Sequence, residues 1–264
     1  MDIANPTYNI IFKYLMNDSN IAKMFLSAII GEKIVELDFQ PKTLLCYGEE
    51  MYIDFPFYYV DFNAKVETET GELKTVIIDL FKDKYHLGLL KLKNSLATTY
   101  PNLDEMYYQG TVNGLQIYSI YLLDYSIGFP DSPLIQVLPQ ITELDTGKEV
   151  QTDDKFIQSL INHIEWIVQV PFFNGRRRTE AEEILNIFNQ ENLTDDDHIL
   201  NIDEKQFSEK FHPIIRKLQE ACTSKEIIKG MQAEDLYRIE MEIKDESLAE
   251  KNKEITELKE TFRK

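Results

Sequence analysis

Two short stretches of the sequence carry residues whose types could bind a metal ion and hydrolyse a phosphodiester. Residues 60–66 include Asp61 and Lys65, and the apolar run 75–84 includes Asp79. Side chains alternate between the two faces of a strand, so Asp61 and Lys65 share a face. A carboxylate inside an apolar strand is costly to bury unless it is paired or binds a cation. A short hairpin would bring Asp61 and Asp79 side by side, where they could bind Mg²⁺, and the ion could activate water.

The elements that must position this pair predict a mixed α/β core. The acidic and glycine-containing stretch 69–72 predicts a hairpin, and a helix is expected to cross between the strands on either side of residues 84–100. The expected strands cover residues 33–39, 53–65, 75–81 and 116–124. The expected helices cover residues 9–30 (with a polar break at 17–20), 84–100, 153–169, 178–190, 204–222 and 224–263. Residues 130–150 predict an extended loop with a short strand.

Three segments share their pattern with one known family. Residues 5–39 read NPTYNIIFKYL onward, residues 60–84 hold Asp61 and Asp79 on strands, and residues 198–221 include HPIIRKLQEA. Together they resemble the recombination-promoting nuclease, or putative transposase, family of PD-(D/E)XK nucleases. The resemblance implies a restriction-endonuclease-like core, a DNA endonuclease that uses Mg²⁺ or Mn²⁺, and Asp61 and Asp79 as metal ligands.

The chain departs from that family pattern at several positions. Asn9 stands where the family often has Asp, and Asp79 stands where it usually has Glu. Phe81 replaces the polar Gln or Lys that would orient the attacking water or stabilise charge on phosphate. The stretch 91–95 keeps lysines but lacks the arginines that grip phosphate with two hydrogen bonds.

Two lysines are candidates for replacing the lost polar group. Lys65 shares a face with Asp61, whereas Lys82 is expected to point to the opposite face of its strand unless a bulge intervenes. Two hypotheses follow. In the first, the chain is a nuclease-fold protein with a degenerate site that acts through protein association. In the second, it is an active Mg²⁺-dependent DNA endonuclease in recombination, mobile-element or defence functions, with Lys65 or Lys82 completing the site.

The charge and the apolar content of the sequence limit which partners and which cellular compartment are expected. The net charge of −18 repels DNA on average, so any DNA binding is expected to be weak and local. The basic triplet 176–178 could contact phosphate, or it could be a solvated loop before a helix capped by Thr179. Apolar runs stay below the roughly 18 residues that a membrane helix needs, and the first residues lack a signal-peptide pattern. We therefore expect a cytoplasmic protein without membrane contact.

The sequence predicts three regions: an α/β nuclease-like core over 1–150, a helical region over 151–232, and a charged helix over 233–264. Apolar residues recur every seventh position in the last region, with Leu258 in an intermediate slot that elsewhere holds Lys244 and Lys251. This heptad pattern predicts a coiled coil that forms a homodimer or pairs with a related nuclease. A solvated helix remains the alternative. The heptad residues are Met241, Leu248, Ile255 and Phe262.

Overall fold

The computed structural model describes residues 1–40, 57–68, 70–83, 116–129, 131–152, 161, 163–173 and 175–262. Its strands are β1 (Asp2–Ala4), β2 (Lys33–Gln40), β3 (Phe57–Glu67), β4 (Leu73–Asp83), β5 (Gln116–Leu123), β6 (Leu134–Val137), β7 (His163–Gln169) and β8 (Ile199–Asn201). Its α-helices are α1 (Asn9–Met16), α2 (Ser19–Ile30), α6 (Glu180–Leu185), α7 (His212–Ala221) and α8 (Lys225–Phe262). Short 3₁₀ turns cover Val170–Phe172, Asn186–Phe188, Gln190–Asn192, Glu204–Gln206 and Glu209–Phe211.

The centre of the fold is a mixed six-stranded sheet in the order β2-β3-β4-β5-β7-β6. Strands β2, β3 and β4 are antiparallel neighbours, β4, β5 and β7 run parallel, and β6 returns antiparallel to β7. The expected strand at 33–39, the hairpin that joins β3 to β4, and the strand at 116–124 are confirmed. The coarse α/β class is therefore correct.

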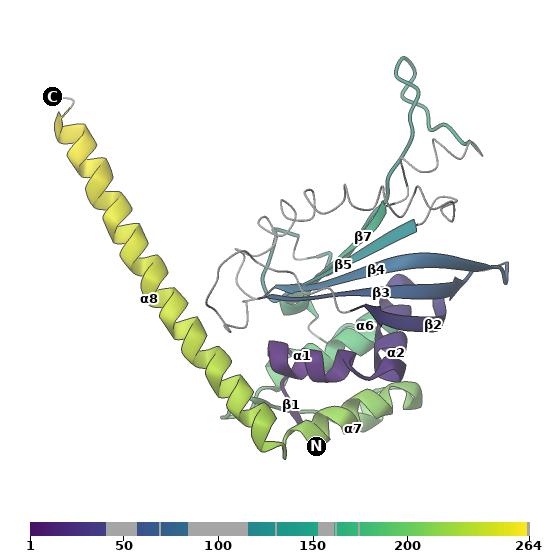
Figure 1. Ribbon diagram of the computed structural model, residues 1–264, viewed down its shortest axis with the longest axis horizontal. Helices are drawn as coiled ribbons and strands as arrows, with labels where there is room; N and C mark the ends of the chain where they lie inside the picture. The colour runs from purple at the N-terminus through teal and green to yellow at the C-terminus, as the bar shows by residue number, and fades with distance from the viewer. Residues whose placement is uncertain are drawn as a thin grey trace.

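The two faces of the sheet have different surroundings. One face packs against α1, α2, α6 and α7, which all lie on the same side of the sheet in Figure 1. Residues at even positions of β3, β4 and β5, such as Phe62, Ile78 and Ile120, belong to this apolar core together with Phe12 and Phe25 of the helices. Residues at odd positions, among them Asp61 and Asp79, point to the opposite face because side chains alternate along a strand. This opposite face carries the candidate site.

The N-terminal helical segment is two helices, not one. The predicted polar break is the point of division: the Asp18 side chain accepts hydrogen bonds from the backbone N–H groups of Asn20 and Ile21 and so caps α2. At the other end Gly31 adopts a left-handed conformation with φ of 75°, which a residue without a Cβ adopts at little cost. Helix α2 therefore begins at a capping aspartate and ends at a glycine.

The predicted helix over 153–169 is wrong for its described C-terminal part, which is strand β7. The sequence HIEWIVQ alternates, so that Trp166 and Val168 enter the core while His163 and Glu165 face the other side. Pairing with β5 and β6 therefore outweighs any local helical preference. The sheet takes strands from both sides of residue 150, so the region 151–232 is not purely helical. Residues 84–115, where a crossing helix was expected, lie outside the described residues.

Two predicted helices, over 178–190 and 204–222, keep their place but are shorter than expected. Helix α6 ends at Leu185, where the Asn186 side chain donates a hydrogen bond of 2.7 Å to the Glu182 carbonyl. The stretch 204–222 forms two 3₁₀ turns before α7, whose first turn contains Pro213. Strands β1 and β8, which sequence reasoning missed, pair the N-terminus with residues 199–201.

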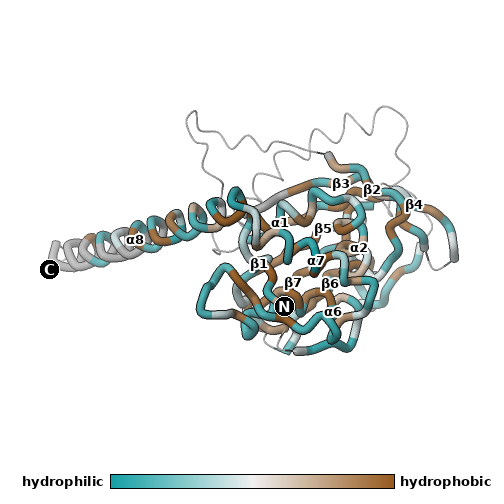
Figure 2. Tube along the Cα trace, turned by 90° about the horizontal axis from the view of Figure 1, so that it is seen from below, coloured by the Kyte–Doolittle hydropathy of each residue, from teal (hydrophilic) through white to brown (hydrophobic). Residues whose placement is uncertain are grey.

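Helix α8 is the longest element and projects from the body of the molecule in Figures 1 and 2. Its 38 residues correspond to roughly 57 Å at 1.5 Å per residue. The first turns are anchored: Met231 is buried, and Glu234 accepts hydrogen bonds from the backbone N–H groups of Asn9 (2.9 Å) and Ile10 (2.7 Å) at the start of α1. Asp235 accepts a hydrogen bond from the Tyr8 hydroxyl at 2.9 Å. The predicted boundary at residue 233 therefore falls inside the docked part of a single helix.

Gly230 sets how closely α8 approaches α1. A Cβ atom built at this position would lie 2.8 Å from Cγ1 of Ile10, closer than van der Waals contact allows. We predict that Gly230→Leu lowers the free energy of unfolding by about 1–3 kcal/mol, because Ile10 is branched and held within the helix contact. Urea denaturation followed by circular dichroism measures this. The matched control is Ala233→Leu at an exposed position of the same helix, which should change stability little. Equal stability of wild type and Gly230→Leu would show that the contact is not tight.

Candidate functional site

Asp61 of β3 and Asp79 of β4 face each other directly across the hairpin. They are register partners in an antiparallel ladder that runs without interruption from Phe57–Asp83 to Glu67–Leu73. Cβ atoms of such directly opposed residues lie about 4.5–5.5 Å apart. Both side chains are buried, with exposed fractions of 3% for Asp61 and 5% for Asp79. The prediction that a hairpin brings the two carboxylates together on one face is confirmed.

Phe81 follows Asp79 by two residues in β4 and therefore points to the same face of the sheet. Its apolar ring is buried there. Its exposed fraction is 1%, and it stacks on Tyr121 of β5 with ring centroids 5.1 Å apart and planes inclined by 12°. The Tyr121 hydroxyl donates a hydrogen bond of 3.3 Å to Glu165. The position where the resemblance requires a polar group is thus part of a buried aromatic stack.

Lys82 does not join the aspartate pair, because it points to the helix side of the sheet. Its ammonium is fully buried and donates hydrogen bonds to the Thr7 carbonyl (2.5 Å), to Asp124 (2.7 Å) and to the Asn9 side-chain oxygen (3.3 Å). No bulge interrupts the pairing of β3 and β4, so the expected alternation holds. The structure therefore places Lys82 and Asn9 together, on the opposite side of the sheet from Asp61 and Asp79.

Lys65 shares a face with Asp61 but is bound to another carboxylate. Its Nζ lies 2.6 Å from a carboxylate oxygen of Glu36 on β2, and 47% of its side chain is exposed. The hydrogen bond to Glu36, followed by the charge of that carboxylate, raises the pKa of Lys65. Lys65 remains a cation at the rim of the sheet, two positions along the face from Asp61. The ion pairs of Lys65 and Lys82 are thus with Glu36 and Asp124, and not with Asp61 or Asp79.

Three polar residues that sequence reasoning missed lie on the same face of the sheet. Ser119 of β5 is the register partner of Asp79, and Glu165 of β7 is the register partner of Ser119. The Ser119 hydroxyl is 2.7 Å from Nε2 of His163, and that nitrogen is 4.0 Å from Glu165. We call Asp61, Asp79, Ser119 and Glu165 the polar row, since each sits beside the next on adjacent strands. The alternation in HIEWIVQ was the signal that could have revealed it.

The two carboxylates of the pair are ligands of the type that divalent cations such as Mg²⁺ use. Mg²⁺ is commonly bound through one or two carboxylates with water or phosphate oxygens in the remaining positions. Asp61 and Asp79 supply two carboxylates on adjacent strands. Among the residues that the structure describes, no group of three or more His, Cys, Asp or Glu side chains is placed to hold a metal ion. Any ion at this pair would therefore complete its coordination with water or with oxygens of a ligand.

The basic triplet 176–178 is used within the chain. Arg176 and Arg178 both form ion pairs with Glu182, at 3.1 and 2.9 Å. The Arg177 guanidinium lies 4.3 Å from the centre of the Phe207 ring and donates to the Gln206 carbonyl. The predicted cap of α6 is confirmed, since the Thr179 hydroxyl accepts a hydrogen bond from the Glu182 backbone N–H at 3.1 Å. These contacts favour the structural interpretation of the triplet.

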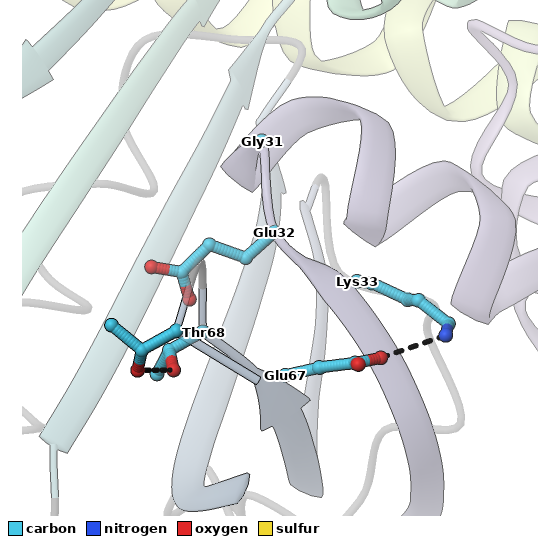
Figure 3. A pocket seen from close by; sticks show the side chains of 6 residues that line it. Gly31, Glu32, Lys33, Glu67 and Thr68 are labelled. Atoms are coloured by element: carbon cyan, nitrogen blue, oxygen red, sulfur yellow. Dashed lines mark hydrogen bonds and ion pairs between the residues drawn. The ribbon is translucent and has the colours of Figure 1, made fainter. Parts of the chain in front are cut away.

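A separate hollow lies at the hairpin end of the sheet, between the end of α2 and the turn after β3 (Figure 3). The Lys33–Glu67 ion pair of 2.7 Å forms part of its wall. Glu32, the residue before β2, also forms an ion pair of 2.9 Å with Lys74 of β4. The hollow is open and its charges are paired, and we assign no chemistry to it. Its lining residues are Gly31, Glu32, Lys33, Glu67, Thr68 and Thr70.

Comparisons with protein-family models, with curated proteins and with solved structures found no match to this chain. Within the described part of the chain, no helix has the length and apolar character needed to cross a membrane.

Lys82 is expected to be structural, and its replacement tests this directly. Lys82→Met removes a buried ammonium from Asp124, whose side chain is 8% exposed. Removing one partner of a buried ion pair costs about 3–5 kcal/mol of the free energy of unfolding. The exposed pair of Lys65 and Glu36 should matter far less, so Lys65→Met should change stability by at most about 1 kcal/mol. Urea denaturation of both variants makes the comparison. An equal effect of the two substitutions would contradict the assignment.

A cation at the carboxylate pair should stabilise the folded protein. A ligand at ten times its dissociation constant adds about 1.4 kcal/mol, because it binds the native state alone. We therefore predict that Mn²⁺ raises the melting temperature by about 3–5 °C in a chain of this size, and that Asp61→Ala abolishes the rise. Differential scanning fluorimetry with and without chelator measures it. A rise of the same size in Asp61→Ala would place the metal at another site.

Proposed function

We propose that this chain is a PD-(D/E)XK nuclease-fold protein of the recombination-promoting nuclease type that has kept its carboxylate pair and lost the polar group needed for catalysis. It is weak or inactive as a nuclease and acts through protein association. The observation that carries the proposal is the position of Phe81. Its ring is buried against Tyr121, one step along the strand from Asp79, where the resemblance calls for Gln or Lys.

The arrangement of the sheet supports the first half of this proposal. Asp61 and Asp79 lie opposite each other on an antiparallel hairpin, and the second strand of that hairpin continues into parallel pairing with β5. Both acids lie on the face away from the apolar core. A divalent ion held by these two carboxylates would polarise a phosphate oxygen and lower the pKa of a bound water. The register of the two strands supports this chemistry, because it sets both carboxylates opposite each other.

The surroundings of the pair support the second half. A phenyl ring can neither orient a water molecule nor donate a hydrogen bond to phosphate. Lys82 is committed to Asp124 on the other face, and Lys65 is held by Glu36. The net charge of −18 further opposes nonspecific attraction of DNA. Both lysines that could have replaced the missing polar group are therefore engaged in ion pairs with other carboxylates.

One observation favours the alternative of an active Mg²⁺-dependent endonuclease. Ser119 and His163 are hydrogen-bonded at 2.7 Å beside Asp79, and Glu165 lies next to them in the polar row. An imidazole is a suitable general base near neutral pH. In this alternative His163 would take over the role of the missing polar group, and His163→Ala would abolish cleavage.

A substitution at Phe81 distinguishes the degenerate nuclease-fold protein from the active endonuclease. We predict that wild-type protein cleaves supercoiled plasmid in Mg²⁺ or Mn²⁺ slowly or not at all, because loss of one donor at such a site costs about 10²–10³ in rate. Phe81→Gln should raise the rate by a similar factor, since Gln supplies a donor next to Asp79. The readout is conversion of supercoiled to nicked plasmid. The double variant Phe81→Gln with Asp79→Ala is the control and should be inactive.

Two results would count against the proposal. Rapid wild-type cleavage that Asp79→Ala abolishes would show that the site is complete, and His163→Ala would then identify the general base. Cleavage that persists in Asp79→Ala would come from another site or from a contaminating nuclease. If both wild type and Phe81→Gln are inactive, the loss of catalysis extends beyond one side chain, and the association role stands alone.

A further inference from the structure

The first half of α8 has two faces with different roles. One face docks on the body through Gly230, Met231, Glu234 and Asp235, which contact α1 and the residues around it. Asp235 also lies 2.7 Å from Nε2 of His198, so both carboxylate oxygens of this residue are used. These contacts fix the rotation of the helix about its own axis. The opposite face must therefore point away from the body.

That opposite face carries three exposed apolar side chains in succession. The exposed fractions are 65% for Leu236, 47% for Ile239 and 60% for Ile243. Their spacing of three and four residues places them on one stripe of the helix. The stripe lies about 120–180° around the axis from Gly230 and Glu234, at about 100° per residue. The described part of the body leaves all three side chains exposed. An apolar stripe of this kind, rimmed by charges, is typical of a helix that pairs with another helix.

Charges are ordered along the same stripe. Lys225 and Lys229 precede the apolar residues and are exposed. Continuing along the stripe at the helical spacing, positions 250 and 254 are both glutamate in the sequence. The stripe thus runs from basic through apolar to acidic. A second copy of the same helix in the reverse direction would set the lysine end of each helix against the glutamate end of the other. A second copy in the same direction would place lysines against lysines and glutamates against glutamates.

We propose that α8 pairs antiparallel with α8 of a second copy of this chain, through the stripe Leu236, Ile239 and Ile243. The occupant is a second copy because the charge order along the stripe is complementary to itself only when the helix direction is reversed. A two-fold symmetric interface uses the same patch on both subunits, as this arrangement does. The inference rests on the association half of the proposed function and is independent of whether the carboxylate pair cleaves DNA.

This interface differs from the heptad seam that the sequence predicts. Ile255, a member of that seam, lies 16 positions after Ile239 and so about 160° around the helix from it. Ile255 is also exposed, at 48%. The two residues therefore form a matched pair: the same residue type, on the same helix, with similar exposure, on opposite faces. Substitution of one or the other decides which stripe is the interface.

The test is the mass of the full chain by light scattering across a range of concentrations. Wild type should be a dimer at micromolar concentration. Ile239→Glu should raise the dissociation constant at least about tenfold, because it sets two carboxylates into the apolar contact, whereas Ile255→Glu should leave it unchanged. Ile243→Glu repeats the result at a second stripe position. Circular dichroism melts confirm that the variants are folded. A monomeric wild type, or dissociation by Ile255→Glu alone, would overturn the inference.

The direction of pairing is tested by exchanging charges. Lys225→Glu with Lys229→Glu should weaken the dimer, and adding Glu250→Lys with Glu254→Lys should restore it, since opposite charges then meet again in the antiparallel arrangement. A parallel arrangement predicts no restoration, and that result would overturn the antiparallel assignment. None of these variants touches the polar row. A failure of dimerisation would therefore leave the outcome of the plasmid assay unchanged, and the two proposals can fail separately.

Discussion

The site depends on one constraint, the uninterrupted antiparallel register between β3 and β4. Because the side-chain period of a strand is two residues, a slip of one residue would move every side chain to the other face. Phe62 and Ile78 are opposed on the core face, with exposed fractions of 1% and 0%. A slip would bring Asp61 or Asp79 into an apolar core, where an unpaired carboxylate is very costly. Packing on one face therefore holds the carboxylates in register on the other.

Lys82 is a fully buried cation on the largely apolar core face, and its contacts explain why it is tolerated. The burial of an ammonium is offset only when its charge is paired and its hydrogens find acceptors. Asp124 supplies the charge, and the Thr7 carbonyl and Asn9 side chain supply two more acceptors. These partners come from the N-terminal segment and from the residue after β5. The interaction thus joins the start of α1 to the central strands and strengthens the same register that positions Asp61 and Asp79.

Local patterns in the sequence were sufficient for the hairpin and for the faces of its strands, because alternation and turn residues act over short range. They were not sufficient for β7. The segment HIEWIVQ becomes a strand through contacts with β5 and β6, both distant in the chain. That error also hid Ser119, His163 and Glu165, which meet only when β7 lies beside β5. The arginine triplet was ambiguous for the same reason, since its acceptor at Gln206 becomes near only on folding.

For helix α8, too, the local sequence pattern is not sufficient to predict which residues face the rest of the chain. A heptad count identifies residues that recur along the helix, but it cannot tell which face the rest of the chain will occupy. That choice is made by the close approach of Gly230 to Ile10 and by the carboxylate of Glu234 at the start of α1. Once these contacts set the rotation, the stripe at Leu236 must face outward, however weak its pattern is in the sequence. The stripe and the polar row lie on different elements. A change of side chain at position 81 of β4 would therefore leave the outward stripe of α8 unaltered.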